Sequence, residues 1–117
     1  MNIEEIREYC LSKKFVTESF PFDDVTLVFK VMNKMFAILS LEGDHGLSLK
    51  CDPDKAIYLR EQYPAVRPGY HLNKRLWNSV HIDGSISDKL IKEWIDDSYN
   101  LIVESLPKKL KLELENL

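Results

Sequence analysis

The sequence is poor in the residues that form disulfide scaffolds, metal centres and phosphate-binding loops. It has only two cysteines, Cys10 and Cys51, too few for a disulfide framework and too far apart for a metal motif. It has only four glycines, and they form no phosphate-cradling loop. No apolar run approaches the roughly 18 residues that a membrane span needs. We therefore expect two free thiols in a reducing compartment and no contact with a membrane.

The start of the chain also lacks the features of an export signal. Residues 1–10 are acidic and amphipathic, whereas a signal peptide has a basic segment followed by an apolar one. Together with the free thiols, this predicts a cytoplasmic protein.

Catalytic and metal-binding patterns are missing as well. Asp96 and Asp97 are adjacent carboxylates, but neighbouring residues on a helix do not face each other. His71 and His81 belong to no HxH or HExxH motif, and a zinc site needs three or four converging ligands. We expect no catalytic residues, no metal and no cofactor.

The composition is that of an ordinary folded domain. The chain has 117 residues, of which 44% are hydrophobic and 30% charged, with a net charge of −3. This length favours a single domain over residues 1–117 with a core of its own. The acidic balance argues against strong generic nucleic-acid binding, for which a pI above about 9 is typical, but it permits a local basic patch.

Hydrophobic periodicity predicts an α+β domain with the element order α-β-β-β-α-β-β-α. The polar connections between the first three strands are short, which indicates antiparallel neighbours. The simplest two-layer arrangement is a mainly antiparallel five-stranded sheet with the helices packed on one face. Helices are expected at 3–13, at 53–62 and from Ser85 or Ser87 to about 105, and strands at 26–31, 35–41, 47–51, 66–70 and 76–82.

Two segments outside these elements need separate treatment. Pro21 disfavours a helix across residues 20–24, and we expect Phe20 and Phe22 to clamp this loop to the core. Pro107 ends the last predicted helix. The tail at 108–117 alternates charged residues with leucine, a pattern that fits an edge strand, a helix or a frayed end.

One segment carries a pattern that suggests binding. From residue 62 to residue 80 the chain has no acidic residue, so this stretch carries +3 and the rest of the chain −6. Basic groups beside aromatic rings suit phosphates and stacked bases. The predicted strands at its two ends would form a hairpin whose tip approaches a nucleic acid. The candidate nucleic-acid-binding residues are Arg67, Tyr70, His71, Asn73, Lys74, Arg75, Trp77 and Asn78.

A structural explanation of the same residues competes with this one. Tyr70 and Trp77 can pack against the last long helix under the stems of the basic side chains, and Asn73 can stabilise a turn. A third hypothesis is a groove between the sheet and that helix, near Trp77 and Trp94, which binds a peptide, a partner protein or a small molecule. With only three cations, binding to DNA would be weak and salt-dependent.

Four blocks of sequence carry a resemblance to a known family. They are residues 20–22 with 27–31, residues 47–53, residues 70–80, and residues 95–99 with 106–109. In this order they resemble the MmcQ/YjbR family. The resemblance implies a two-layer α+β fold described as frataxin-like (CyaY-like) or secretion-chaperone-like, and DNA binding by double-wing hairpins. One departure is Leu76, where family members often have histidine, so no role of that histidine carries over.

Overall fold

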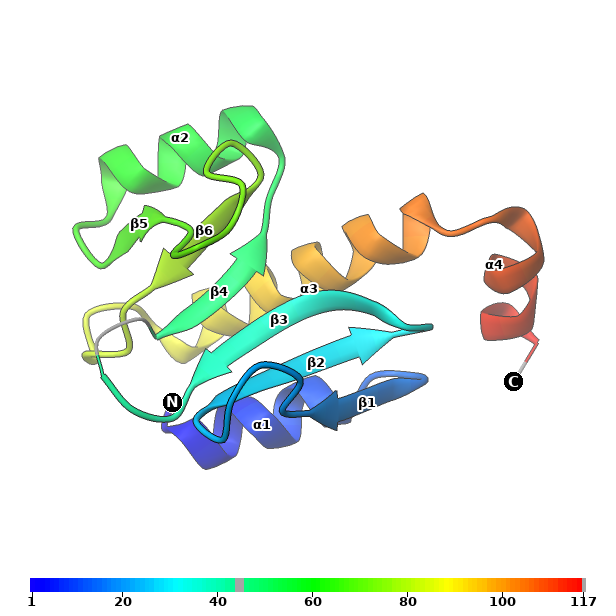
Figure 1. Ribbon diagram of the computed structural model, residues 1–117. Helices are drawn as coiled ribbons and strands as arrows, with labels where there is room; N and C mark the ends of the chain where they lie inside the picture. Colours follow the sequence, from blue (N-terminus) through cyan, green and yellow to red (C-terminus); the bar gives the residue numbers. More distant parts are fainter. Residues whose placement is uncertain (44–45, 117) are drawn as a thin grey trace.

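A six-stranded sheet forms one layer of the molecule and three helices form the other (Figure 1). The computed structural model describes residues 1–43 and 46–116. The predicted α+β class and the placement of the helices on one face are confirmed. The helices are α1 (Ile3–Leu11), α2 (Pro53–Gln62), α3 (Asp88–Ser105) and α4 (Lys108–Glu115). The strands are β1 (Val16–Ser19), β2 (Thr26–Val31), β3 (Lys34–Ser40), β4 (Leu47–Lys50), β5 (Val66–Pro68) and β6 (Trp77–Val80).

The sheet is antiparallel throughout and has the order β1-β2-β3-β4-β6-β5. The predicted count of five strands was wrong because β1 was missed. Only one of the two side chains that β1 turns toward the helices, Val16, is apolar; the other, Glu18, pairs with Arg7 of α1. So short an edge strand leaves no hydrophobic alternation to recognise.

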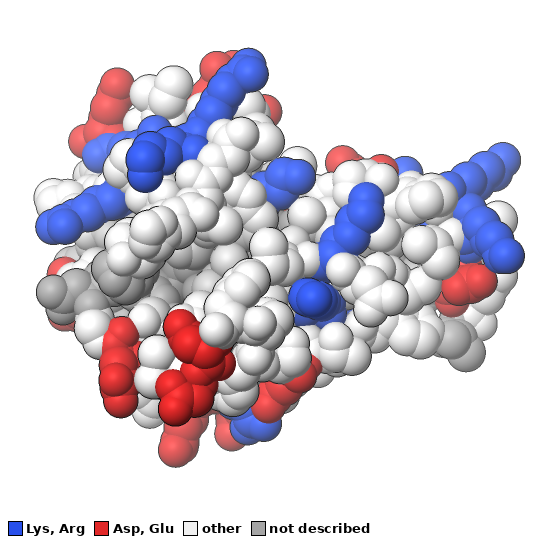
Figure 2. Space-filling model, in the orientation of Figure 1, with Lys and Arg blue, Asp and Glu red and all other residues white. Residues whose placement is uncertain are grey.

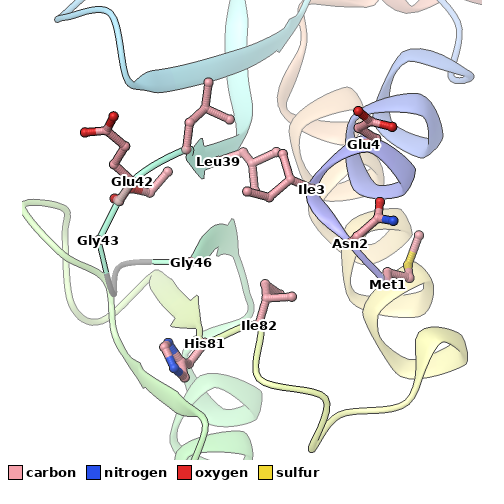
Figure 3. A pocket seen from close by; sticks show the side chains of 12 residues that line it. Met1, Asn2, Ile3, Glu4, Leu39, Glu42, Gly43, Gly46, His81 and Ile82 are labelled. Carbon is pink, nitrogen blue, oxygen red and sulfur yellow. The ribbon is translucent and has the colours of Figure 1, made fainter.

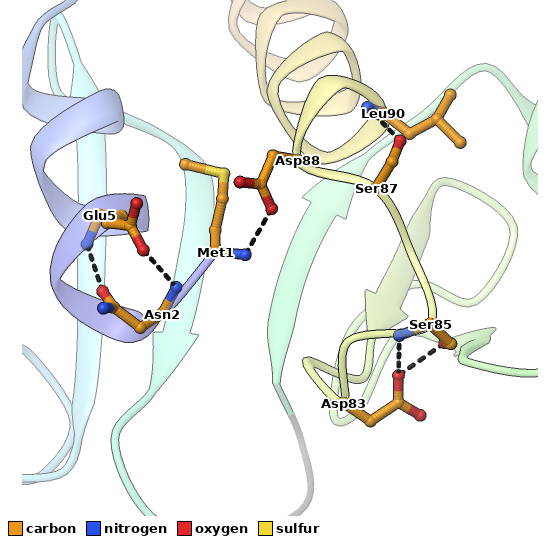
Figure 4. A network of polar contacts seen from close by, with 8 residues as sticks. All are labelled: Met1, Asn2, Glu5, Asp83, Ser85, Ser87, Asp88 and Leu90. Carbon is orange, nitrogen blue, oxygen red and sulfur yellow. Dashed lines mark hydrogen bonds and ion pairs between the residues drawn. The ribbon is translucent and has the colours of Figure 1, made fainter.

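Side-chain caps fix where the helices begin (Figure 4). Asn2 accepts a hydrogen bond from the Glu5 N–H, and the Glu5 carboxylate accepts one from the Asn2 N–H, which forms a capping box at α1. Ser87 caps α3, while Ser85, the other predicted cap, donates to Asp83 in the preceding turn. Short-range hydrogen bonds therefore fix the first residues of α1 and α3.

The core fills the space between the sheet and the helices. Side chains alternate along each strand except at a β-bulge in β3, where Phe36 is the extra residue and lies on the core side together with Ala37. Phe36 lies near its centre, with its ring edge-on to Tyr99 at 5.4 Å between centroids, and Trp94 packs edge-on against Tyr63 at 5.3 Å. The fully buried members with the largest side chains are Phe29, Phe36, Ile6, Leu39, Leu47 and Ile95.

The sheet opens between β3 and β4, and a hydroxyl from α3 bridges the gap. Hydrogen-bonded pairs alternate along an antiparallel ladder. Ser40 N–H donates to Gly46 C=O, so Lys50 N–H would donate to Phe36 C=O further along. Instead the Ser98 hydroxyl accepts from Lys50 N–H at 2.9 Å and donates to Phe36 C=O at 2.5 Å. Figure 1 shows the two strands diverging in front of α3.

The tail folds as a helix, one of the three alternatives that its sequence pattern allowed. α4 follows Pro107 directly, and its Leu114 side chain is buried in the core cluster. The prediction for the tail also covered Leu117, which lies outside the described residues. Within the described ranges, no helix is both long and apolar enough to cross a membrane.

Candidate functional site

The second face of the sheet carries no helix and looks toward the viewer in Figure 1. The strand registers place one residue from each inner strand and from β5 in a single row across this face: Val28, Ile38, Ser48, Ser79 and Arg67. This row passes from apolar through hydroxyl to cationic side chains. We call this surface the open face.

Two loops fold over the open face from opposite sides (Figure 1). The first, residues 20–25, joins β1 to β2, and the second, residues 69–76, joins β5 to β6. Phe20 and Phe22 lie in the first loop with 47% and 66% of their surface exposed. The expectation that they clamp this loop to the core was wrong. The Asp23 carboxylate holds the loop instead, by accepting from the N–H groups of Val25 and Thr26 at 3.0 and 2.7 Å.

A groove lies between the two loops, with a volume of about 310 Å³. Phe22 and Asp23 form one wall, and residues 70–72 form the other. The floor is the sheet itself, with Ile38 and Ser48 at its centre. The groove thus has an aromatic ring on each side and an apolar floor edged with hydroxyls.

The Asp23 carboxyl group in this wall favours its ionised form. Hydrogen bonds from the backbone of Val25 and from the side chain and backbone of Thr26 lower the pKa of Asp23 below its ordinary value. The carboxylate therefore stays ionised at neutral pH and makes this wall acidic.

The opposite wall is held by Arg60 from α2, which sequence reasoning missed. Its guanidinium donates to the backbone carbonyls of Lys74 and Trp77 and, through Nε, to the Asn78 side chain at 2.6 Å. The Asn78 amide in turn donates to the Ala56 carbonyl at 3.2 Å. Arg60 therefore ties the end of the 69–76 loop to α2, on the helix side of the sheet.

The start of the same loop is tied down on the open face. The Ser48 and Ser79 hydroxyls lie 2.7 Å apart, and Ser79 Oγ also accepts from the Tyr70 N–H at 3.1 Å. Gly69 has no room for a side chain, because a Cβ there would lie 2.8 Å from the Trp77 Cβ. His71 follows with φ of 55°, the left-handed conformation that few residues other than glycine adopt. The loop is thus fixed at both ends.

A second hollow, of about 440 Å³, lies on the other side of Tyr70. It contains Arg67, Lys74 and His81, and no carboxylate is among the residues that line it. Within residues 1–43 and 46–116, neither Arg67 nor Lys74 forms an ion pair. We call it the basic hollow, and Tyr70 belongs to both it and the groove.

Charge is divided across the open face (Figure 2). Lys and Arg side chains gather at the upper left, around β5 and β6, with acidic side chains along the top edge over α2, and a separate group of acidic side chains lies at the lower left. The surface is hollowed between them. The positive side matches the segment that sequence composition had singled out.

The predicted binding residues divide into exposed and buried ones. Arg67, Tyr70, His71, Lys74 and Arg75 are exposed on or beside the open face. These five therefore lie where a ligand could reach them.

The remaining three have structural roles. Asn73 is exposed, but its side chain accepts from the Arg75 N–H at 2.9 Å, which is the turn-stabilising role considered above. Trp77 is buried beneath the 69–76 loop, on the face opposite α3 rather than against it. Asn78 is buried and hydrogen-bonded to Arg60 and Ala56.

The groove expected between the sheet and α3 is not suitable for a ligand. The hollow there, which reaches Trp94, has about 20 Å³, roughly the space of one water molecule. The core fills this interface, so a ligand of the alternative class would have to use the open face.

A larger hollow lies where the start of α1 meets the end of β3 (Figure 3). It measures about 690 Å³ and includes Glu4 and Glu42, with His81 and Ile82 on its far side (Figure 3). Its acidic lining makes it a poor match for phosphates, and we assign it no ligand.

The two histidines of the segment lie in different hollows. His71 lines the groove, whereas His81 lines the basic hollow. Among the residues that the structure describes, no three His, Cys, Asp or Glu side chains come together as a metal site.

Comparison with known proteins gives a consistent result. The YjbR family model matches residues 11–101. The uncharacterised protein YjbR of Escherichia coli K12 is 36% identical over the full length of both chains, and YbdF of Escherichia coli O157:H7 is 38% identical over 91% of this chain and 88% of its own. The crystal structure of a Deinococcus radiodurans protein, assigned to domain family DUF419, superposes with a TM-score of 0.89 at 38% identity, covering 97% of this chain and 88% of that one. A Pseudomonas syringae crystal structure gives 0.74 at 28% identity, covering 86% and 98%. The chain belongs to the YjbR family.

Proposed function

We propose that this protein is a non-enzymatic binding module that holds nucleic acid on the open face of its sheet. The observation that carries the proposal is the basic hollow beside the aromatic groove. Arg67 and Lys74 line that hollow, Arg75 lies exposed in the same loop, and none of the three is ion-paired within the described ranges. Lys74 Nζ donates to the Gly69 carbonyl at 3.3 Å, so its charge has a backbone partner but no carboxylate. Cations without a carboxylate partner next to exposed rings are the combination that binds phosphates and bases.

The number of cations sets the expected strength of binding. For a single strand, log K falls with log salt by about 0.7 per phosphate contacted. Three contacts therefore predict roughly a 15- to 20-fold loss of affinity between about 50 and 200 mM salt. The net charge of −3 keeps the interaction weak and local.

Fluorescence anisotropy with labelled single- and double-stranded DNA at those two salt concentrations tests the proposal. The variant Arg67→Ala/Lys74→Ala/Arg75→Ala is expected to lose binding. Its matched control removes three exposed cations elsewhere, as Lys89→Ala/Lys108→Ala/Lys109→Ala, and keeps it. No binding up to tens of micromolar protein at low salt, or equal binding by the two variants, would contradict the proposal.

A second candidate function is the binding of a protein segment or small apolar ligand in the groove. The exposure of Phe22, opposite Tyr70, favours it, because exposed aromatic rings are common anchors of interfaces. Binding of the apolar dye ANS that Phe22→Ala removes and the triple charge variant leaves intact would support this function. It would become the working hypothesis if nucleic acid does not bind.

We also propose that the protein works in the cytoplasm. Cys10 and Cys51 are buried free thiols, which suits a reducing compartment.

A further inference from the structure

We propose that the groove holds one unpaired nucleobase while the neighbouring phosphates lie in the basic hollow, so that the site selects single-stranded nucleic acid. This inference rests on the function proposed above and goes further, because it assigns a different part of the ligand to each hollow. It concerns Phe22 and Tyr70 above all, the two rings on opposite walls of the groove.

The size and lining of the groove suit a flat aromatic ring. Its volume of about 310 Å³ is at the lower end of ligand pockets, which span roughly 300–1,000 Å³. Ile38 supplies an apolar part of the floor, and Ser40 and Ser48 add hydroxyls that are hydrogen-bonded to the Glu42 carbonyl and to Ser79. Bases within a duplex are already stacked and paired, and only an unpaired base can enter a recess of this kind.

The exposed rings are what a base would stack on. Phe22 is 66% exposed and Tyr70 is 49% exposed. Stacking on an aromatic side chain strengthens single-strand binding by roughly five- to a hundred-fold per base, with little dependence on sequence. The Tyr70 ring already contacts the edge of the His71 ring, with 4.0 Å between centroids, so Phe22 is the main stacking surface for a base and Tyr70 bounds the other side of the groove.

The basic hollow lies where the backbone of such a strand would run. Tyr70 separates the two hollows and lines both. Ser48, on the groove floor, pairs with Ser79, which pairs with Arg67, so Arg67 is two strand spacings away, roughly 10 Å. Lys74 belongs to the same hollow. A base in the groove thus leaves its phosphates on the side of Arg67 and Lys74.

The acidic wall determines on which side of the groove the phosphates lie. Asp23 stands beside Phe22 on the far side of the groove, and its hydrogen bonds to Val25 and Thr26 keep it ionised. A phosphate there would meet a negative charge, whereas one across Tyr70 meets two positive charges. Charge therefore favours a sugar–phosphate backbone on the Tyr70 side of the groove over one on the Phe22 side.

The wall that carries Tyr70 is held before any ligand arrives. Ser79 accepts from the Tyr70 N–H, Arg60 holds the Lys74 carbonyl, and His71 takes a left-handed backbone conformation in between. A residue other than glycine keeps a positive φ when the surrounding contacts hold it there, as these hydrogen bonds do. Little ordering of this wall is then needed on binding.

The test compares two labelled oligonucleotides of equal length by fluorescence anisotropy: oligo-dT, and an abasic strand with the same phosphates. The wild-type protein is expected to bind oligo-dT at least five-fold more tightly than the abasic strand, and more tightly than duplex. Phe22→Ala is expected to reduce that preference several-fold, since Tyr70 remains, and to leave the affinity for the abasic strand unchanged. The matched control is Phe20→Ala, an exposed phenylalanine of the same loop outside the groove, which keeps the preference.

The outcomes separate this inference from the function on which it rests. Equal affinity for the two oligonucleotides, lost in the Arg67/Lys74/Arg75 variant, overturns the base site but leaves phosphate binding standing. Tighter binding of duplex than of oligo-dT also overturns it. Absence of binding to either oligonucleotide overturns both. Phe22 is exposed, so its replacement does not threaten the fold, and an unchanged Tm verifies this.

Discussion

The two faces of the sheet differ in how their polar groups are used. On the helix side, polar atoms complete the architecture: Ser98 replaces a missing ladder bond, and Asn78 joins α2 to β6. On the open face, hydroxyls and backbone groups position a loop, and the cations of that loop have no carboxylate partner in the described ranges. The polar groups of the helix side are used within the fold, whereas the open face keeps exposed cations and rings that the proposed ligand would contact. Substitutions on the first should therefore change stability, and substitutions on the second should change binding.

The largest effect is expected from Ser98→Ala on the helix side. It leaves Lys50 N–H and Phe36 C=O without their partner in a site where Ser98 is completely buried. Two unsatisfied buried groups cost about 2–4 kcal/mol, which lowers Tm by roughly 8–16 °C for a domain of this size. Thermal unfolding followed by circular dichroism measures this.

Ser105→Ala is the matched control in the same helix. Its hydroxyl donates to the Ile102 carbonyl at an exposed position, so the change should cost less than about 0.5 kcal/mol. A Ser98→Ala protein as stable as this control would show that the sheet closes without the bridge.

Arg60→Ala should free the 69–76 loop from α2. Hydrogen bonds from a charged donor to the Lys74 and Trp77 carbonyls are lost, with a cost of about 1–3 kcal/mol. Trypsin should then cleave faster after Lys74 or Arg75, as mass spectrometry of a digestion series would show. Lys55→Ala, also in α2, removes only a half-exposed ion pair with Asp97 and should leave the cleavage rate unchanged. Equal rates in the two variants would mean that the loop is held by other contacts.

The hydroxyl pair beneath the loop should give a smaller and non-additive effect. Ser48→Ala and Ser79→Ala each break the same 2.7 Å contact, at a cost of about 1 kcal/mol each. The double variant should be little worse than Ser79→Ala, which gives a coupling of about 1 kcal/mol in denaturant unfolding. Strict additivity of the two costs would rule out a direct bond between the hydroxyls.

The last prediction concerns the pKa of Tyr9 on the helix side, which affects stability only at alkaline pH. Burial, together with the hydrogen bond to Asp96, raises the pKa of Tyr9 to about 12. Because the folded pKa lies above the unfolded value near 10, the stabilisation is complete below pH 10 and is lost as pH rises toward 12. Tyrosinate absorbance should show a late step that Tyr9→Phe reduces, with Tyr99, whose pKa burial also raises, accounting for the rest. A wild-type titration complete by about pH 11 would contradict this prediction.

The elements that sequence predicted best are those set by local rules. α3 has apolar residues at helical spacing and a serine cap, and α2 begins with Asp52 followed by Pro53, so both could be placed closely. Strands β2 to β6 were placed to within about two residues, because runs of β-branched and other apolar residues between polar turns are a property of each strand alone. By contrast β1, with one inward apolar side chain, gave no such signal.

The site was harder to predict because it depends on contacts between distant residues. The basic segment was visible as composition, but periodicity does not tell which face a loop covers, so Phe22 was assigned to the core. Arg60 of α2 anchors the loop, and the sequence around Arg60 contains no pattern that predicts this role. The alternative groove was predicted near Trp77 and Trp94, between the sheet and the last helix. The two tryptophans lie on opposite sides of the sheet, and strand pairing, which the spacing of residues in the sequence does not reveal, decides this.

The opening between β3 and β4 has a mechanical consequence. One wall of the groove, with Phe22 and Asp23, is carried by β1, β2 and β3, and the other, with residues 70–72, by β4, β5 and β6. The seam between these two half-sheets has three ladder pairs and then the Ser98 bridge. The distance between the two walls of the groove therefore depends on the angle between the half-sheets. A molecule bound in the groove would contact both half-sheets on the open face, while α3 links them on the other face through Ser98.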